Sequence, residues 1–96
     1  MDKEKMIELF DQYLNSPDNE LREDEKPSQR SDLCAFLRLD KLLPGDMDMV
    51  AAGEHDMIYL EPDLDELAAV ITEDDIRYLA ACGVHYDDTD SLAMFV

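Results

Sequence analysis

Apolar residues recur at helical spacing at the start of the chain. Between Lys3 and Leu14 they fall on one side of a helix, and Asp2 stands where an N-cap residue accepts a backbone N–H. The next segment, from Asn15 to Arg30, keeps one large apolar residue, Leu21, among charged residues and two prolines, a pattern typical of a flexible linker. The sequence therefore predicts an N-terminal helix over residues 1–14 followed by a flexible connection over residues 15–30.

A second helix is predicted to begin at Ser31, a favourable N-cap residue, and to end before Pro44 and Gly45. Its buried stripe is expected to comprise Leu33, Phe36, Leu37, Leu39 and Leu43. The segment that follows, Met47 to Ala52, fits either a short helix or a strand. Met57 to Glu61 alternates β-branched and aromatic residues before Pro62, which predicts a strand.

Two short helices are expected next. Asp63 or Asp65 is placed to begin a third helix that buries Leu64, Leu67 and Ala68. Thr72 and Asp75 have the spacing of a capping box, with aspartate in place of the usual glutamate, and begin a fourth helix. That helix should bury Ile76, Leu79 and Ala80 and end at Gly83, because glycine takes the left-handed conformation of a helix C-terminus without strain.

The last segment predicts a β-hairpin, in which Val84–Tyr86 and Leu92–Val96 flank the acidic turn Asp87–Asp90. These elements indicate one α+β domain over residues 1–96, with about four helices packed on a small antiparallel sheet and a compact body over residues 31–96. Alternate residues of the last strand are apolar on both faces. An open sheet face that meets a partner or a second copy is therefore expected, with Met94 and Phe95 as a candidate dimer face; helices covering both faces are the alternative.

Charge changes this picture more than any motif does. The chain has 25 Asp and Glu against 8 Lys and Arg, a formal net charge of −17, and sixteen of the acids lie after Arg30 among ordered segments. Such a surface disfavours direct binding to nucleic acid, whose phosphates need a basic footprint, and binding to anionic membranes. The expected partner is a basic protein, such as a host nucleic-acid-binding complex; solubility alone is the simpler explanation.

The acidic residues expected to contact that partner lie near predicted helix starts and turns. They are Glu54, Asp56, Asp63, Asp65, Glu66, Asp74, Asp75, Asp87, Asp88 and Asp90. His55 lies between two of these acids, but neighbours in a turn point apart, and no nucleophile is nearby. We therefore expect a non-enzymatic protein.

Two cysteines, and no apolar signal segment at the N-terminus, indicate a reducing compartment and a cytoplasmic protein. Cys34, His55, Cys82 and His85 are four potential zinc ligands. Structural zinc sites usually show two close ligand pairs, whereas only Cys82 and His85 are close here, so buried thiols are the favoured interpretation and no cofactor is expected.

Four segments resemble a group of small phage- and prophage-encoded acidic proteins that have no assigned activity. They are Leu33–Gly45, Ala52–Leu60, Cys82–Asp87 and the terminal Leu92–Val96. The resemblance implies a phage accessory protein acting in the host cytoplasm, and it implies no particular site. Two functions then compete. One is an inhibitor of the anti-CRISPR or anti-restriction type that mimics phosphate charge; the other is a phage structural or accessory protein that self-associates through an apolar sheet face.

Overall fold

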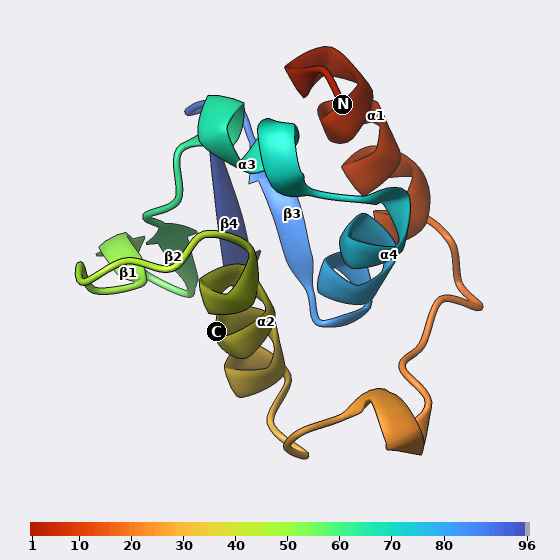
Figure 1. Ribbon diagram of the computed structural model, residues 1–96. Coiled ribbons are helices and arrows are strands. Elements are labelled where there is room, and N and C mark those ends of the chain that lie inside the picture. The colour runs from red at the N-terminus through yellow and green to blue at the C-terminus, as the bar shows by residue number, and fades with distance from the viewer. Residues whose placement is uncertain (96) are drawn as a thin grey trace.

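The computed structural model describes residues 1–95, in which four α-helices pack on one side of a four-stranded sheet (Figure 1). The elements are α1 (Lys3–Leu14), the short 3-10 helix η1 (Glu23–Glu25), α2 (Ser31–Leu42), β1 (Val50–Glu54), β2 (Met57–Leu60), α3 (Leu64–Val70), α4 (Glu73–Ala81), β3 (Val84–Asp87) and β4 (Ser91–Phe95). All strand pairs are antiparallel and the strand order is β1-β2-β4-β3. The predicted α+β class is confirmed.

Helices α1, α3 and α4 begin where a short polar side chain satisfies a free backbone N–H group. In α2 the cap residue is Arg30, which makes no side-chain cap bond, and Ser31 is already helical, so the prediction of Ser31 as an N-cap is wrong. Asp2 accepts from the backbone N–H of Lys5 at 2.8 Å, and Asp63 accepts from that of Glu66 at 3.0 Å. At the start of α4 both halves of the capping box form, because Thr72 and Asp75 each accept from the other's backbone N–H. Gly83 follows α4 with φ of +97°, as expected for the residue after a helix C-cap.

The ambiguous segment before the predicted strand contributes β1. This strand pairs with β2, and its register shifts between Val50 and Ala52, which marks a bulge. All five β1 residues are exposed, so β1 is an edge strand with neither face covered. The β1–β2 turn is made by His55 and Asp56, with His55 in the left-handed region at φ of 43°. Sequence alternation missed this strand because small residues on two exposed faces give no pattern of burial.

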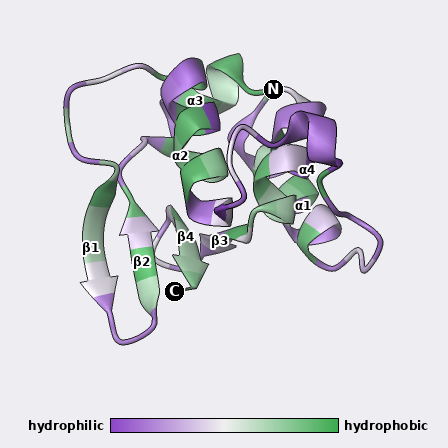
Figure 2. Ribbon diagram, turned by 90° about the horizontal axis from the view of Figure 1, so that it is seen from below, coloured by the Kyte–Doolittle hydropathy of each residue, from purple (hydrophilic) through white to green (hydrophobic). Residues whose placement is uncertain are grey.

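All four helices lie on the same side of the sheet (Figure 2). The core lies between the two layers, and it includes Leu92 and Met94 of β4, Met6 and Phe10 of α1 and residues of the other helices. The other sheet face is open, so the alternative with helices on both faces is wrong. The prediction that Met94 belongs to an exposed dimer face is also wrong. Met94 is 3% exposed and points to the helices, whereas its neighbour Phe95 is 67% exposed.

Helix α2 is rotated from the predicted orientation. The buried residues are Cys34, Ala35 and Leu39, while Leu33 and Leu37 are exposed. The small side chains of Cys34 and Ala35 let α2 approach the core closely, which a count of large apolar residues does not anticipate. Val96, predicted as the last residue of the hairpin, lies outside the described residues.

The segment between α1 and α2 is tied to α4. Arg77 of α4 binds the carboxylate of Glu25 at 2.7 Å, and the Tyr78 hydroxyl donates to the Glu25 carbonyl at 3.2 Å. Asn19 donates to the Arg77 carbonyl at 3.1 Å, and Leu21 packs against the core. The flexibility predicted for residues 15–30 concerns dynamics and stays a prediction.

Candidate protein-interaction surfaces

Most of the positive charge is already engaged within the fold. Five of the eight bases form ion pairs with carboxylates. These bases are Lys3, Arg22, Lys26, Arg38 and Arg77. Only six of the 25 acids take part in such pairs within residues 1–95. The remaining acidic surface therefore has few cations of its own to neutralise it.

The acidic row predicted on α4 is bonded within the fold, and Asp74 and Asp75 are paired with arginines. Asp75 turns inward to complete the capping box and to pair with Arg38 at 2.9 Å. Asp74 pairs with Arg77 at 2.8 Å, and the hydrogen bond from Arg77 holds the pKa of Asp74 below its usual value. Glu73 accepts from the Tyr13 hydroxyl at 2.6 Å. Each of these carboxylates thus has a partner inside the fold.

The acids of the β3–β4 turn are partly engaged in shaping it. Asp87 accepts from the backbone N–H and hydroxyl of Thr89, and these bonds lower the pKa of Asp87. Asp90, at φ of 63°, binds Lys3 at 2.8 Å and the Tyr86 hydroxyl at 3.1 Å. Asp88 makes no such side-chain bond within residues 1–95, so one of the three acids predicted here has a free carboxylate.

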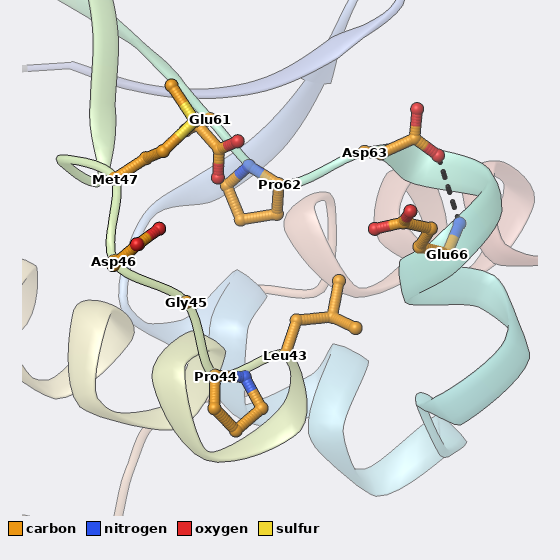
Figure 3. A pocket seen from close by; sticks show the side chains of 9 residues that line it. All are labelled: Leu43, Pro44, Gly45, Asp46, Met47, Glu61, Pro62, Asp63 and Glu66. Carbon is orange, nitrogen blue, oxygen red and sulfur yellow. Dashed lines mark hydrogen bonds between the residues drawn. The ribbon is translucent and has the colours of Figure 1, made fainter.

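The structure also brings together acids that are distant in the sequence. A groove of about 350 Å³ lies between the loop after α2 and the start of α3 (Figure 3). It is lined by Leu43, Pro44, Gly45, Asp46, Met47, Glu61, Pro62, Asp63 and Glu66. Four of these nine residues are acidic and none is basic. We call this feature the acidic groove.

Pairing of β1 with β2 assembles the acidic groove. The backbone N–H of Glu61 donates to the Met49 carbonyl at 2.7 Å, which extends the hairpin and brings Glu61 toward the loop that carries Asp46. Glu66 reaches toward this loop from α3 (Figure 3). Sequence analysis identified Asp63 and Glu66 but missed Asp46 and Glu61, because their proximity depends on a strand that the pattern left undecided.

The acidic groove combines apolar side chains with carboxylates, and this combination suits a lysine or arginine side chain. Such side chains lay their methylene stems on apolar surface and direct the charged end to acids.

Among the acids predicted to bind a partner, Asp56, Asp65, Glu66 and Asp88 form no side-chain hydrogen bond or ion pair within residues 1–95. Glu54 accepts only from the Tyr59 hydroxyl, at 3.2 Å. These five are the predicted acids most available to a cation.

A second hollow, of about 400 Å³, lies between α1 and the β3–β4 hairpin. Its lining residues are Ile7, Glu8, Asp11, Leu14, Tyr86 and Asp88. It again combines apolar side chains with carboxylates and has no basic residue in its lining. The acidic character of this protein is thus distributed over more than one face.

The open sheet face is aromatic. Phe95 stacks on His85 with ring centroids 4.9 Å apart and planes 19° apart. Met57 pairs with Phe95 across the β2–β4 ladder, and Tyr59 pairs with Ala93. Ala93 is fully buried although no helix lies on this side, because the larger side chains around it cover it. Partial burial, and then the charge of Glu54, raise the pKa of Tyr59.

The four potential zinc ligands are not brought together. Within residues 1–95, no group of three or more His, Cys, Asp or Glu side chains is arranged to hold a metal ion. Cys34 and Cys82 are free buried thiols, and burial raises the pKa of Cys82 to about 12. His55 lies in the exposed β1–β2 turn and His85 on the open sheet face. The thiols therefore behave as small apolar core groups.

Comparison with protein-family models, with curated proteins and with solved structures finds no match to this chain. No helix within residues 1–95 combines the length and apolar character that crossing a bilayer needs. Functional inference therefore rests on the surfaces described above.

Proposed function

We propose that this protein is a non-enzymatic, cytoplasmic binding protein that occupies the nucleic-acid-binding surface of a basic host protein. The observation that supports this proposal is the uneven distribution of positive charge along the chain. After Lys41 the sequence contains one basic residue, Arg77, and both of its ion pairs are made within the fold. The acidic groove and the β3–β4 turn thus present carboxylates that a basic surface would neutralise.

The proposed partner belongs to the class that binds phosphate backbones. Arginines and lysines on such proteins recognise arrays of negative oxygens, and carboxylates on a rigid fold supply similar charge. A phage accessory protein of the anti-CRISPR or anti-restriction type fits this chemistry and the resemblance to phage-encoded proteins. The mimicry centres on the acidic groove and Asp88, because the acids of α4 are paired.

DNA-cleavage inhibition tests this proposal. We would titrate the protein into plasmid digestions by a type I restriction enzyme, a type II restriction endonuclease and a CRISPR effector nuclease, at about 0.15 M NaCl. We expect inhibition of at least one enzyme that excess DNA relieves. Failure to inhibit any of the three would contradict the proposed function.

A matched pair of variants separates specific recognition from net charge. Asp46→Asn, Glu61→Gln and Glu66→Gln together remove three charges from the acidic groove but keep Asp63, the α3 cap. Asp18→Asn, Glu20→Gln and Asp40→Asn together remove three charges elsewhere. We expect the groove variant to inhibit at least about tenfold less well and the control variant to inhibit normally. Equal losses would indicate non-specific charge attraction.

Self-association is the second candidate function, and the exposure of Phe95 favours it. A phage structural or accessory protein that dimerises through the open sheet face would keep its oligomer mass at high salt, since apolar contacts are not screened. Light scattering at about 0.05 M and about 1 M NaCl distinguishes this case from a charge-driven complex. A monomer at both salt concentrations would contradict self-association.

A further inference from the structure

Phe95 is an exposed aromatic residue on the open face of the sheet. Its side chain is 67% exposed, the highest value among the large apolar side chains of the sheet. It stacks on His85 of β3 and pairs across the ladder with Met57 of β2, so three strands contribute. Within residues 1–95, no helix covers this side of the sheet (Figure 2). An exposed aromatic side chain flanked by half-buried Met57 and His85 is a candidate interaction site.

Carboxylates border this apolar surface. Glu54 pairs with Met57 across the β1–β2 ladder, and Asp56 lies in the adjoining turn. Asp87 shares the face of His85, two residues along β3. The four strands and their two hairpin turns contain no Lys or Arg. The border is therefore negative.

The negative charge of this border indicates which kind of partner can bind the open sheet face. A second copy would bring the same carboxylates against one another, and each copy carries a formal charge of −17. Like charges facing each other across an interface oppose association. A partner with an apolar centre and a basic margin would instead match both features, since arginine also lies favourably on aromatic rings.

We propose that the open sheet face is the anchor for the basic partner, with Phe95 seated in an apolar hollow and the partner's Lys or Arg facing Glu54, Asp56 and Asp87. This inference rests on the proposed function and adds an apolar contact to the charged contacts of the acidic groove. The carboxylates steer the encounter, and the aromatic contact holds the complex once formed. Part of the affinity is then retained at salt concentrations that screen the carboxylates.

A peptide titration tests the anchor without the natural partner. The probe is the acetylated and amidated peptide Arg-Arg-Leu-Val-Leu-Arg-Arg, and its control replaces the three central residues by serine at equal charge. Backbone amide NMR of the full chain at about 0.15 M NaCl locates binding. We expect shift changes concentrated in β2, β3 and β4, and binding of the serine peptide at least about tenfold weaker.

Two variants test whether Phe95 is part of the peptide-binding site. Phe95→Ser should weaken binding of the apolar peptide at least about tenfold. Leu37→Ser, on the outer side of α2, removes another exposed apolar side chain and should leave binding unchanged. Equal binding by the two variants would overturn the inference, as would shift changes confined to the acidic groove.

The nuclease assay separates this inference from the proposed function. If the unaltered protein inhibits a nuclease and Phe95→Ser inhibits it equally, the anchor is wrong and the proposed function stands. If the unaltered protein inhibits no nuclease, the proposed function is wrong and the peptide titration decides the anchor. A dimer by light scattering that Phe95→Ser dissociates would assign the face to a second copy and overturn the anchor.

Discussion

Arg38 of α2 and Asp75 of α4 form an ion pair with a distance of 2.9 Å between Nη1 and Oδ1. The same guanidinium lies 3.7 Å from the ring centroid of Tyr78. Because Asp75 also completes the capping box with Thr72, one carboxylate both begins α4 and joins it to α2. Asp75 is therefore a structural residue, and its charge is not free for a partner.

Asp75→Ala should destabilise the fold by about 2 kcal/mol, because it removes a cap and a partly buried charged hydrogen bond. Asp74→Ala is the matched control. Its side chain is 71% exposed, so the loss should stay below about 1 kcal/mol. Urea denaturation followed by circular dichroism measures both. Equal losses would show that Asp75 has no special structural role.

Met94 and Phe95 are neighbours on β4 that face opposite sides of the sheet, so their truncation should have unequal effects. Met94→Ala leaves a cavity in the core and should cost about 2–5 kcal/mol. Phe95→Ala should cost less than about 1 kcal/mol, because its ring is mostly exposed. Thermal and chemical unfolding test this difference. A comparable loss at Phe95 would mean that its stacking on His85 stabilises the fold.

Added NaCl should stabilise the protein. The molecule measures 29 × 26 × 26 Å, and at about 0.01 M salt the Debye length is about 30 Å, so carboxylates repel one another across the whole molecule. At about 1 M salt that length falls to about 3 Å. We expect the melting temperature to rise over this range. Sucrose, which does not screen charge, provides the control at matched concentrations.

If the melting temperature rose no more in NaCl than in sucrose, self-repulsion would not limit stability. A fall with salt would mean that the ion pairs outweigh the repulsion. Either outcome would contradict this account of the net charge.

The Lys3–Asp90 pair predicts a pH dependence with a definite sign. The bond from Lys3, followed by that from Tyr86, lowers the pKa of Asp90 from its ordinary 3.8. A carboxyl whose pKa is lowered on folding stabilises the fold above its unfolded pKa, and this contribution is lost as pH falls through its folded pKa. The contribution should therefore be complete above about pH 5 and be lost progressively below about pH 4, as pH falls through the lowered pKa of Asp90.

Asp90→Asn isolates this contribution, because asparagine tolerates the left-handed backbone at this position. The difference in free energy of unfolding between the two proteins should be constant from about pH 5 to pH 7 and shrink below about pH 4. Urea denaturation across this range measures it. A difference that does not change with pH would exclude the charge of Asp90 as its source.

Helix starts were the most predictable part of the fold. Asp2, Asp63 and Thr72 cap helices through local hydrogen bonds that need only a few neighbouring residues. Strand β1 was not predictable in this way, because its small exposed side chains gain their conformation from pairing with β2. The orientation of α2 also depended on its neighbours, since Cys34 and Ala35 fill space that only the complete core defines.

For the surface residues too, local arrangements were predictable from the sequence and tertiary ones were not. Asp63 and Glu66 were found because they lie together at one helix start, whereas Asp46 joins them through tertiary contacts. Asp75 was predicted as a free acid because its distant partner, Arg38, lies 37 residues earlier. A carboxylate's availability depends on cations that local sequence does not show.

The place of β4 in the sheet has a consequence for synthesis. β4 lies between β2 and β3, so the β1–β2 hairpin joins the rest of the sheet only through a strand made later. While the ribosome holds residues after Asp87, β2 and β3 have no shared partner, and the apolar sides of α1 and α4 lack part of their cover. Closure of the sheet must therefore follow release of β4 from the exit tunnel. Until then we expect the nascent chain's surplus of carboxylates to oppose aggregation.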